Sequence, residues 1–216
     1  MHAGSPPANR RGPLYRRSVK AALAYRTARV HYLDLDRAVH WLARGRKEMV
    51  AALRVARRHP LLLLGRTPKA HQSHHLPLYA TETLVNRLFA LRLGLVGRLD
   101  LLVPSFVLTR DLAGLLLQRS RALDAGFYGE WAALLLGMTA EVAYLECRGL
   151  EWETPDRHRR AVRRIGLAAW RRRQDTPKEW SLRVDLAREF VAGFERAVER
   201  GALRAPAVRR IPQRLG

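Results

Sequence analysis

The sequence predicts an all-α fold, a single-domain bundle of five or six helices. Three observations lead to this prediction. A chain of 216 residues, 48% of them hydrophobic, is long enough for one domain with a substantial core. Apolar residues recur at spacings of three, four and seven over several segments, which is the period of an amphipathic helix. Two segments also open with Thr-Pro and an acid in the first turn, a pattern typical of helix starts.

The first of these helices is expected over about 34–58. Its apolar stripe consists of Leu35, Val39, Leu42, Met49, Leu53 and Ala56. Basic residues follow with the same spacings but offset by two positions, about 200° around a helix. A basic stripe is therefore expected opposite the apolar one. The preceding stretch, 26–33, fits either a short strand or the end of a helix, and its pattern does not decide between them.

Residues 59–80 interrupt the helical pattern. Pro60 and Gly65 bracket a leucine run, and a polar loop follows that contains His71, His74 and His75. No cysteine or carboxylate lies in this loop to complete a tetrahedral site, so we predict no metal centre there. A solvated loop that gains positive charge below about pH 6.5 is expected instead.

Five more helices account for most of the remaining chain. One begins at Thr81 and fades near Gly94, and a second begins after Thr109 as N-cap and stops at Gly126. A third, about 128–148, has the most regular apolar stripe, typical of an internal bundle seam or, as the minority reading, of a homodimer seam. The last two are expected at about 155–173 and from the capping box at Thr176 to Gly201.

The charge is unusual in amount and in distribution. The chain holds 40 Lys and Arg against 19 Asp and Glu, a formal net charge of +21. Residues 1–80 contribute +13, residues 81–153 contribute −2, and residues 154–216 contribute +10. A neutral, leucine-rich middle between basic flanks indicates a packing core that carries a polyanion-binding surface on either side. Phosphate backbones are the commonest partner of such a surface.

The two termini are expected to be basic and irregular. Residues 1–17 predict a disordered basic arm ahead of a helical domain over 18–201, and residues 202–216 a basic tail. An acid-free, arginine-rich start is also typical of a mitochondrial transit peptide, and we favour the arm. No signal peptide is visible, and the best hydrophobic stretch, 84–103, carries several charges. A cytoplasmic protein is expected, associated with the nucleoid in a bacterium, with a mitochondrial location as the alternative.

Arginines concentrate in the segment 155–173. At 100° per residue, six of its eight arginines fall on one arc of a helix. Trp170 lies at the edge of that arc. It either stacks on a base or packs inward against the last helix. Like charges on one face repel each other unless phosphates bind there. With the basic stripe of 34–58, this gives the predicted nucleic-acid-binding residues: Arg37, Arg44, Lys47, Arg54, Arg58, Arg157, Arg160, Arg163, Arg164, Arg171 and Trp170.

The leading hypothesis is a non-catalytic nucleic-acid-binding protein. It would be a DNA-binding regulator or architectural factor, for example of a plasmid or other mobile element. It would act alone, as a homodimer or in a larger nucleoprotein assembly. Phosphate-cradling glycine loops, HExxH, CxxC and GxSxG are absent, so no enzyme, cofactor or metal is predicted. The single cysteine, Cys147, is expected to be buried. The alternatives are a helical ribonucleoprotein subunit (the small subunit of an RNA-guided CRISPR-type complex or a mitochondrial ribosomal protein) and, more weakly, a peripheral membrane binder.

Overall fold

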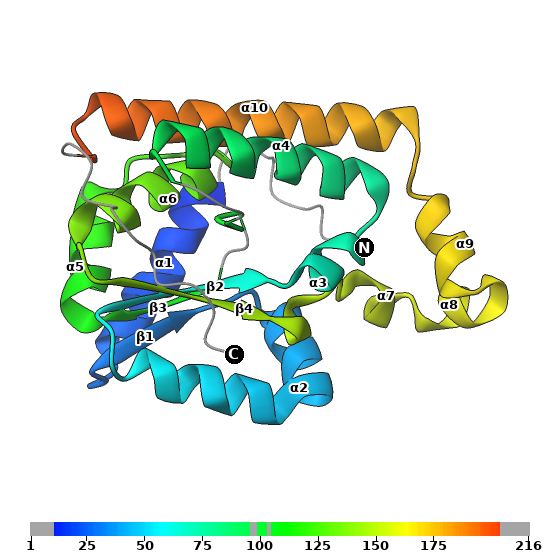
Figure 1. Cartoon of the computed structure of the whole chain (residues 1–216), viewed down its shortest axis with the longest axis horizontal. Coiled ribbons are helices and arrows are strands. Elements are labelled where there is room, and N and C mark those ends of the chain that lie inside the picture. Colours follow the sequence, from blue (N-terminus) through cyan, green and yellow to red (C-terminus); the bar gives the residue numbers. More distant parts are fainter. Residues whose placement is uncertain (1–10, 96–98, 103–104, 204–216) are drawn as a thin grey trace.

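A mixed four-stranded sheet lies at the centre of the molecule. The computed structural model describes residues 11–95, 99–102 and 105–203 (Figure 1). The strands are β1 (Arg29–Tyr32), β2 (Leu61–Arg66), β3 (Phe106–Thr109) and β4 (Val142–Cys147), in the spatial order β1-β3-β2-β4. β3 runs antiparallel to both β1 and β2, whereas β4 pairs parallel to β2 with Leu61 opposite Val142. The prediction of an all-α bundle of five or six helices is therefore wrong.

Helices cover both faces of this sheet. On one face lies α2 (Leu35–Ala56), and on the other lie α1, α4, α5, α6 and α10 (Figure 1). The bounds of this second group are Arg11–Ala24 for α1, Leu76–Arg92 for α4, Arg110–Arg119 for α5, Phe127–Met138 for α6 and Pro177–Glu199 for α10. Short helices complete the described chain: α3 (Pro68–Gln72), the 3₁₀ turn Arg148–Leu150, α7 (Thr154–Arg157), α8 (Arg159–Ile165) and α9 (Leu167–Arg172).

The leucine run 61–64 is a central strand rather than a break. Leu61 and Leu63 belong to the core on the side of α6 and α10, while Leu62 and Leu64 belong to the core against α2. All four are buried. A strand covered on both faces is apolar throughout instead of alternating, and a run of this length cannot be distinguished from a helical segment by its period.

The expected helix over 128–148 divides into a helix and a strand. Its stripe begins in α6, but Val142 and Leu145 belong to β4. Apolar residues spaced by three and four are typical of a helix with one face on the core. The same spacing also occurs in a short strand that packs on a core, so the spacing alone does not distinguish the two. The open choice at 26–33 is decided by β1, whose pairing with β3 sets Val30 opposite Leu108.

Helix α2 has the predicted length but not the predicted faces. Gly45 leaves helical geometry at φ −143° and ψ 39°, so the helix kinks there. Before the kink, α2 buries Arg37, His40 and Trp41, and the predicted core residues Leu35, Val39 and Leu42 are 79%, 60% and 52% exposed. After the kink it buries Ala56, as the stripe predicts, and also Ala52, which the stripe did not include, while Met49 and Leu53 pack against the core partly buried.

Helix ends follow local signals only in part, since α4 begins at Leu76 and not at Thr81, and α5 ends at Arg119 and not at Gly126. Thr109 caps α5 by accepting a hydrogen bond from the backbone of Leu112, and Thr176 caps α10 by accepting one from Glu179, as expected. Gly201, at φ +77°, follows the end of α10. The predicted arm at 1–17 is helical from Arg11 onward, within α1, and residues 1–10 lie outside the described residues, as does most of the predicted tail.

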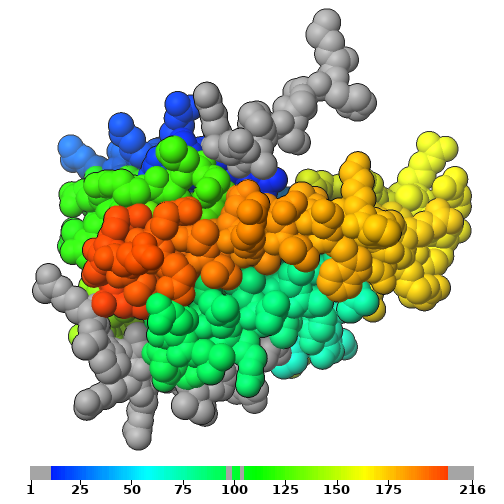
Figure 2. All heavy atoms as spheres, turned by 90° about the horizontal axis from the view of Figure 1, so that it is seen from above, coloured from blue at the N-terminus to red at the C-terminus, as the bar shows by residue number. Residues whose placement is uncertain are grey.

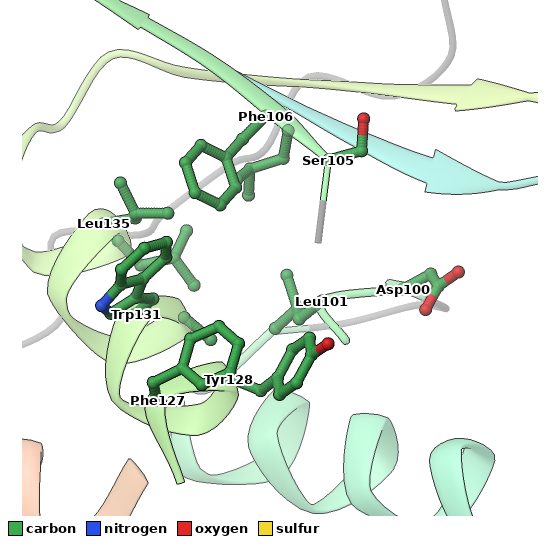
Figure 3. Close-up of a pocket in the computed structure, with 11 residues that line it drawn as sticks. Asp100, Leu101, Ser105, Phe106, Phe127, Tyr128, Trp131 and Leu135 are labelled. Carbon is green, nitrogen blue, oxygen red and sulfur yellow. The ribbon is translucent and has the colours of Figure 1, made fainter. Parts of the chain in front are cut away.

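An enclosed cavity lies between the sheet and α6. Figure 3 shows Phe127, Tyr128 and Trp131 of α6 on one side of it, with Phe106 of β3 and Leu101 also facing it. Its volume is about 30 Å³. That is room for a water molecule and too little for a substrate, so we treat it as a packing feature of the core.

Candidate nucleic-acid interface

The described acids lie mostly inside the protein or are partly covered. The exposed acids are Asp111, Glu141, Asp175, Asp185 and Glu199, whereas exposed Lys and Arg residues occur on nearly every described helix. Buried acids such as Glu130 and Asp100 are occupied by internal hydrogen bonds. The described surface is therefore more basic than the overall balance of charges indicates.

The predicted arginine helix is three short helices. Between α7 and α8 the backbone leaves helical geometry at His158, and between α8 and α9 it does so at Gly166, whose φ is +79°. A residue with a Cβ rarely adopts that φ, which favours glycine at this turn. In Figure 1, α8 and α9 lie at one end of the molecule, beyond the sheet, and α9 leads back to α10. Figure 2 shows this end from above, where the yellow segment extends past α10 (orange).

The arginines of this segment are exposed, and several of them have no internal partner. Arg160, Arg163 and Arg164 of α8 make no ion pair or side-chain hydrogen bond with any described residue, and neither do Arg172 and Arg173. Arg157 lies 3.5 Å from Asp36 of α2. Arg171 donates to the backbone carbonyls of Gln72 and Ser73, at 3.0 and 3.4 Å. The unpaired members give α8 and α9 a surface of one charge sign.

Trp170 is part of the core and not of this surface. It is 7% exposed, and its ring lies 5.1 Å from that of Trp152 and 5.2 Å from that of His158. The inward orientation of Trp170 is confirmed, although the partner is Trp152 rather than the last helix. Trp170 is therefore removed from the candidate interface.

The predicted basic residues of α2 divide at the kink. Arg37 is 8% exposed and donates to Glu153 at 3.2 Å, so it cannot contact a phosphate. Arg44 is exposed but lies 3.4 Å from Asp156 and 3.7 Å from Glu151. Lys47, Arg54 and Arg58, on the second half of the helix, are exposed and unpaired among the described residues. They remain candidates.

Ion pairs hold the first half of α2 against α7. His40 is buried and its Nδ1 lies 2.5 Å from Asp156. Burial alone would raise the pKa of the Asp156 carboxyl, but the hydrogen bond and charge of His40, with Arg44, outweigh it and lower the pKa. These pairs fix the first half of α2, before the kink, next to the segment that leads into α8.

A buried ionic cluster at the carboxyl end of β2 was not predicted. Arg66, 1% exposed, donates to both oxygens of Asp100 at 2.6 and 2.9 Å and to Glu82 at 2.6 Å. Asn86 also donates to Asp100, at 3.0 Å. Burial alone would raise the pKa of both acids, but Arg66 outweighs it, lowering the pKa of Glu82 to about 2 and that of Asp100 well below its usual range.

Two of the three histidines of the expected polar loop contact this cluster, His71 through Glu82 and His74 through Arg66, while His75 lies beside Glu179 and Trp152. His71, His74 and His75 are each at most 3% exposed, so the prediction of a solvated loop is wrong. His74 donates from Nδ1 to the carbonyl of His71 and accepts at Nε2 from Arg66, which fixes a neutral ring. Burial lowers the pKa of His74 and, with nearby Arg183, lowers that of His75 to about 4. The rings of His74 and His75 therefore stay neutral through the physiological range.

This cluster does not have the character of an acid–base site. A general acid or base works best with a pKa near the operating pH, whereas Glu82 and Asp100 are held ionised by Arg66. Asp34 is different, since burial raises its pKa to about 6, but it is the N-cap residue of α2 and does not belong to this cluster. Cys147 is buried, as predicted, and burial raises the pKa of its thiol. No group of metal-ligating side chains suited to an ion occurs in the described ranges.

An open groove lies beside the arginines, between the start of α4 and α9. Its volume is about 400 Å³. Gln72, His74 and Tyr79 form one wall, and Arg171, Arg172 and Asp175 form the other. It therefore combines aromatic surface with exposed positive charge, and nothing in the sequence indicated it because its walls are about 100 residues apart.

Comparison of the chain with protein-family models, curated proteins and solved structures yields no match. Among the helices that the structure describes, none has the length and apolar character needed to cross a membrane.

Proposed function

We propose that this chain is a non-catalytic nucleic-acid-binding protein, a regulator or architectural factor, that holds phosphates with the arginines of α8 and α9. The observation that carries the proposal is the set of exposed arginines without internal partners on these two helices. Solvated protein surfaces normally alternate charge signs, and on an isolated helix such like-charge neighbours are unfavourable. Neutralisation by phosphates removes that repulsion and releases condensed counterions.

The second half of α2 supplies a further group of contacts. Lys47, Arg54 and Arg58 lie on its exposed side, and Arg46 and Arg57 are exposed beside them. The ion pairs between α2 and α7 hold the first half of this helix next to the segment that precedes α8. A strand of nucleic acid that crosses both surfaces meets more phosphate contacts than either offers alone, and this raises both the affinity and its salt dependence.

The test is reversal of two α8 charges. We expect Arg160→Glu with Arg164→Glu to weaken binding of a labelled oligonucleotide at least about tenfold and to reduce the log–log salt slope by about two or more. For the unaltered protein a slope of about −5 to −9 corresponds to six to ten phosphate contacts. Fluorescence anisotropy across a salt titration measures both quantities, and circular dichroism verifies that the variant remains folded.

A matched control carries the same change in net charge elsewhere. Arg87→Glu with Arg188→Glu alters one exposed arginine on α4 and one on α10, neither with a side-chain partner among the described residues. This variant should retain most of the affinity. Equal losses in the two variants would mean that only net charge matters, and unchanged binding after the α8 reversal would refute the proposed interface.

A further inference from the structure

The groove between α4 and α9 has the size and chemistry of a site for one unpaired base. Ligand pockets for compounds of nucleotide size enclose on the order of 300–1,000 Å³, and this groove encloses about 400 Å³. Leu76, 52% exposed, and the half-buried ring of Tyr79 give it apolar and aromatic surface. Aromatic surface of this kind stacks on the face of any base.

The polar groups of the groove suit a nucleotide as well. Arg172 is exposed and unpaired among the described residues, and Arg171 crosses the opening to bond the carbonyls at the end of α3. The one carboxylate on the wall, Asp175, accepts a hydrogen bond from the indole of Trp180 at 2.7 Å. Single-strand binding sites combine positive charge with an aromatic surface on which a base stacks, and the two walls of this groove offer that combination.

The wall on the α4 side is rigid. Tyr79 packs on the ring of His71 at 4.9 Å, and His74 is fixed between Arg66 and the carbonyl of His71. The buried cluster of Arg66, Asp100 and Glu82 therefore supports this wall of the groove. A wall that does not reorganise loses little freedom when a ligand binds.

The broken arginine segment does not suit reading of a duplex. One helix over 155–173 would be about 28 Å long, whereas α8 and α9 span seven and six residues, about 10 Å each. A helix that reads the major groove presents a continuous face to base edges. Here the arginines surround a turn at Gly166, next to an opening that a paired and stacked base cannot enter.

We infer that the groove receives an unpaired base of a single-stranded nucleic acid, whose neighbouring phosphates lie on the arginines of α9 and α8. This inference rests on the proposed function and specifies its ligand. Stacking contributes on the order of 1–3 kcal/mol per base, which converts to about 5- to 150-fold in affinity.

The experiment compares three labelled 20-mers with the full chain by fluorescence anisotropy: a single strand, its duplex, and an abasic strand of the same length and charge. We expect the single strand to bind at least about fivefold more tightly than either other ligand. Tyr79→Ala should remove that advantage and leave affinity for the abasic strand unchanged. Tyr25→Ala, at a tyrosine that is 70% exposed beyond the end of α1, is the matched control and should change nothing.

The outcomes separate the inference from the proposed function. Equal binding of the base-bearing and abasic strands, or a preference for the duplex, overturns the groove site but leaves phosphate binding intact. Failure of all three ligands to bind overturns both. Because Tyr79 also packs on His71, circular dichroism of Tyr79→Ala is needed; if that variant unfolds, the abasic comparison with the unaltered chain decides the inference on its own.

Discussion

Replacement of Arg66 by methionine is expected to lower the free energy of unfolding by about 3–5 kcal/mol at pH 7. The substitution keeps an unbranched side chain in the core but leaves Asp100 and Glu82 without the guanidinium that both accept from. Two ionised carboxylates would then be buried without a cation. Since a domain of this size is stable by only about 5–15 kcal/mol, the loss should be evident as a lower urea midpoint.

The pH dependence of this loss has a definite sign. In the intact protein the pKa of Glu82, about 2, and that of Asp100 lie below their unfolded values. Their contribution to stability is therefore present above about pH 4 and lost as the pH falls through the folded values. Without Arg66, burial raises the pKa values of both carboxyls. The destabilisation from burying them in ionised form therefore exists above about pH 4 and disappears as the carboxyls gain protons. The difference between variant and parent should thus shrink from pH 7 to pH 3.5.

Arg92→Met is the matched control for this experiment. Arg92 makes an equally short bidentate pair, donating to Glu195 at 2.7 and 2.9 Å, but the pair is on the surface. Water screens it and solvates either partner alone, so this variant should unfold almost like the parent at every pH. A larger loss for Arg92→Met than for Arg66→Met, or a difference for Arg66→Met that grows in acid, would contradict the assignment of the buried cluster.

Local sequence signals predicted the capped helix starts at Thr109 and Thr176 and misassigned the strands, for physical reasons. A cap such as Thr176 acts on a backbone group three residues away, so its effect can be read from the sequence. The strand β2 depends on pairing with β3 and β4, which lie some 40 and 80 residues further along the chain. A leucine run carries no signal of those partners, and only the final packing on both faces distinguishes it from a buried helix.

The candidate interface could be predicted only in part. The exposed arginines of α8 were identifiable because like charge is concentrated there in the sequence. Arg37 shared the same spacing, yet its partner Glu153 is 116 residues away and binds it inside the protein. Arg66 likewise depends on an aspartate 34 residues away. Periodicity assigns residues to a face of a helix, whereas the kink at Gly45 and these distant carboxylates determine which face is free.

Replacement of Gly129 by alanine is the second large effect that we expect, a loss of about 3 kcal/mol in the free energy of unfolding, at the upper end of the usual range for overpacking. Gly129 faces α10 where α6 and α10 approach most closely, and a Cβ there would overlap the backbone carbonyl oxygen of Phe190. Gly193 of α10 meets the backbone of Gly126 in the same way. Because the obstacle is backbone, no side chain can rotate aside.

The helices would have to separate, and a shift of α10 would disturb the stacking of its Phe194 on Phe89 of α4, whose ring centroids lie 4.3 Å apart. Gly114→Ala in α5 tests the opposite case, since a Cβ there meets nothing within 4 Å. In that open position alanine gains its helix preference over glycine, about 0.5–1 kcal/mol, with no steric cost. Thermal and urea unfolding should therefore move in opposite directions for the two variants. A stable Gly129→Ala protein would mean that α10 can shift on α6, and with it the anchoring of α9 and its arginines.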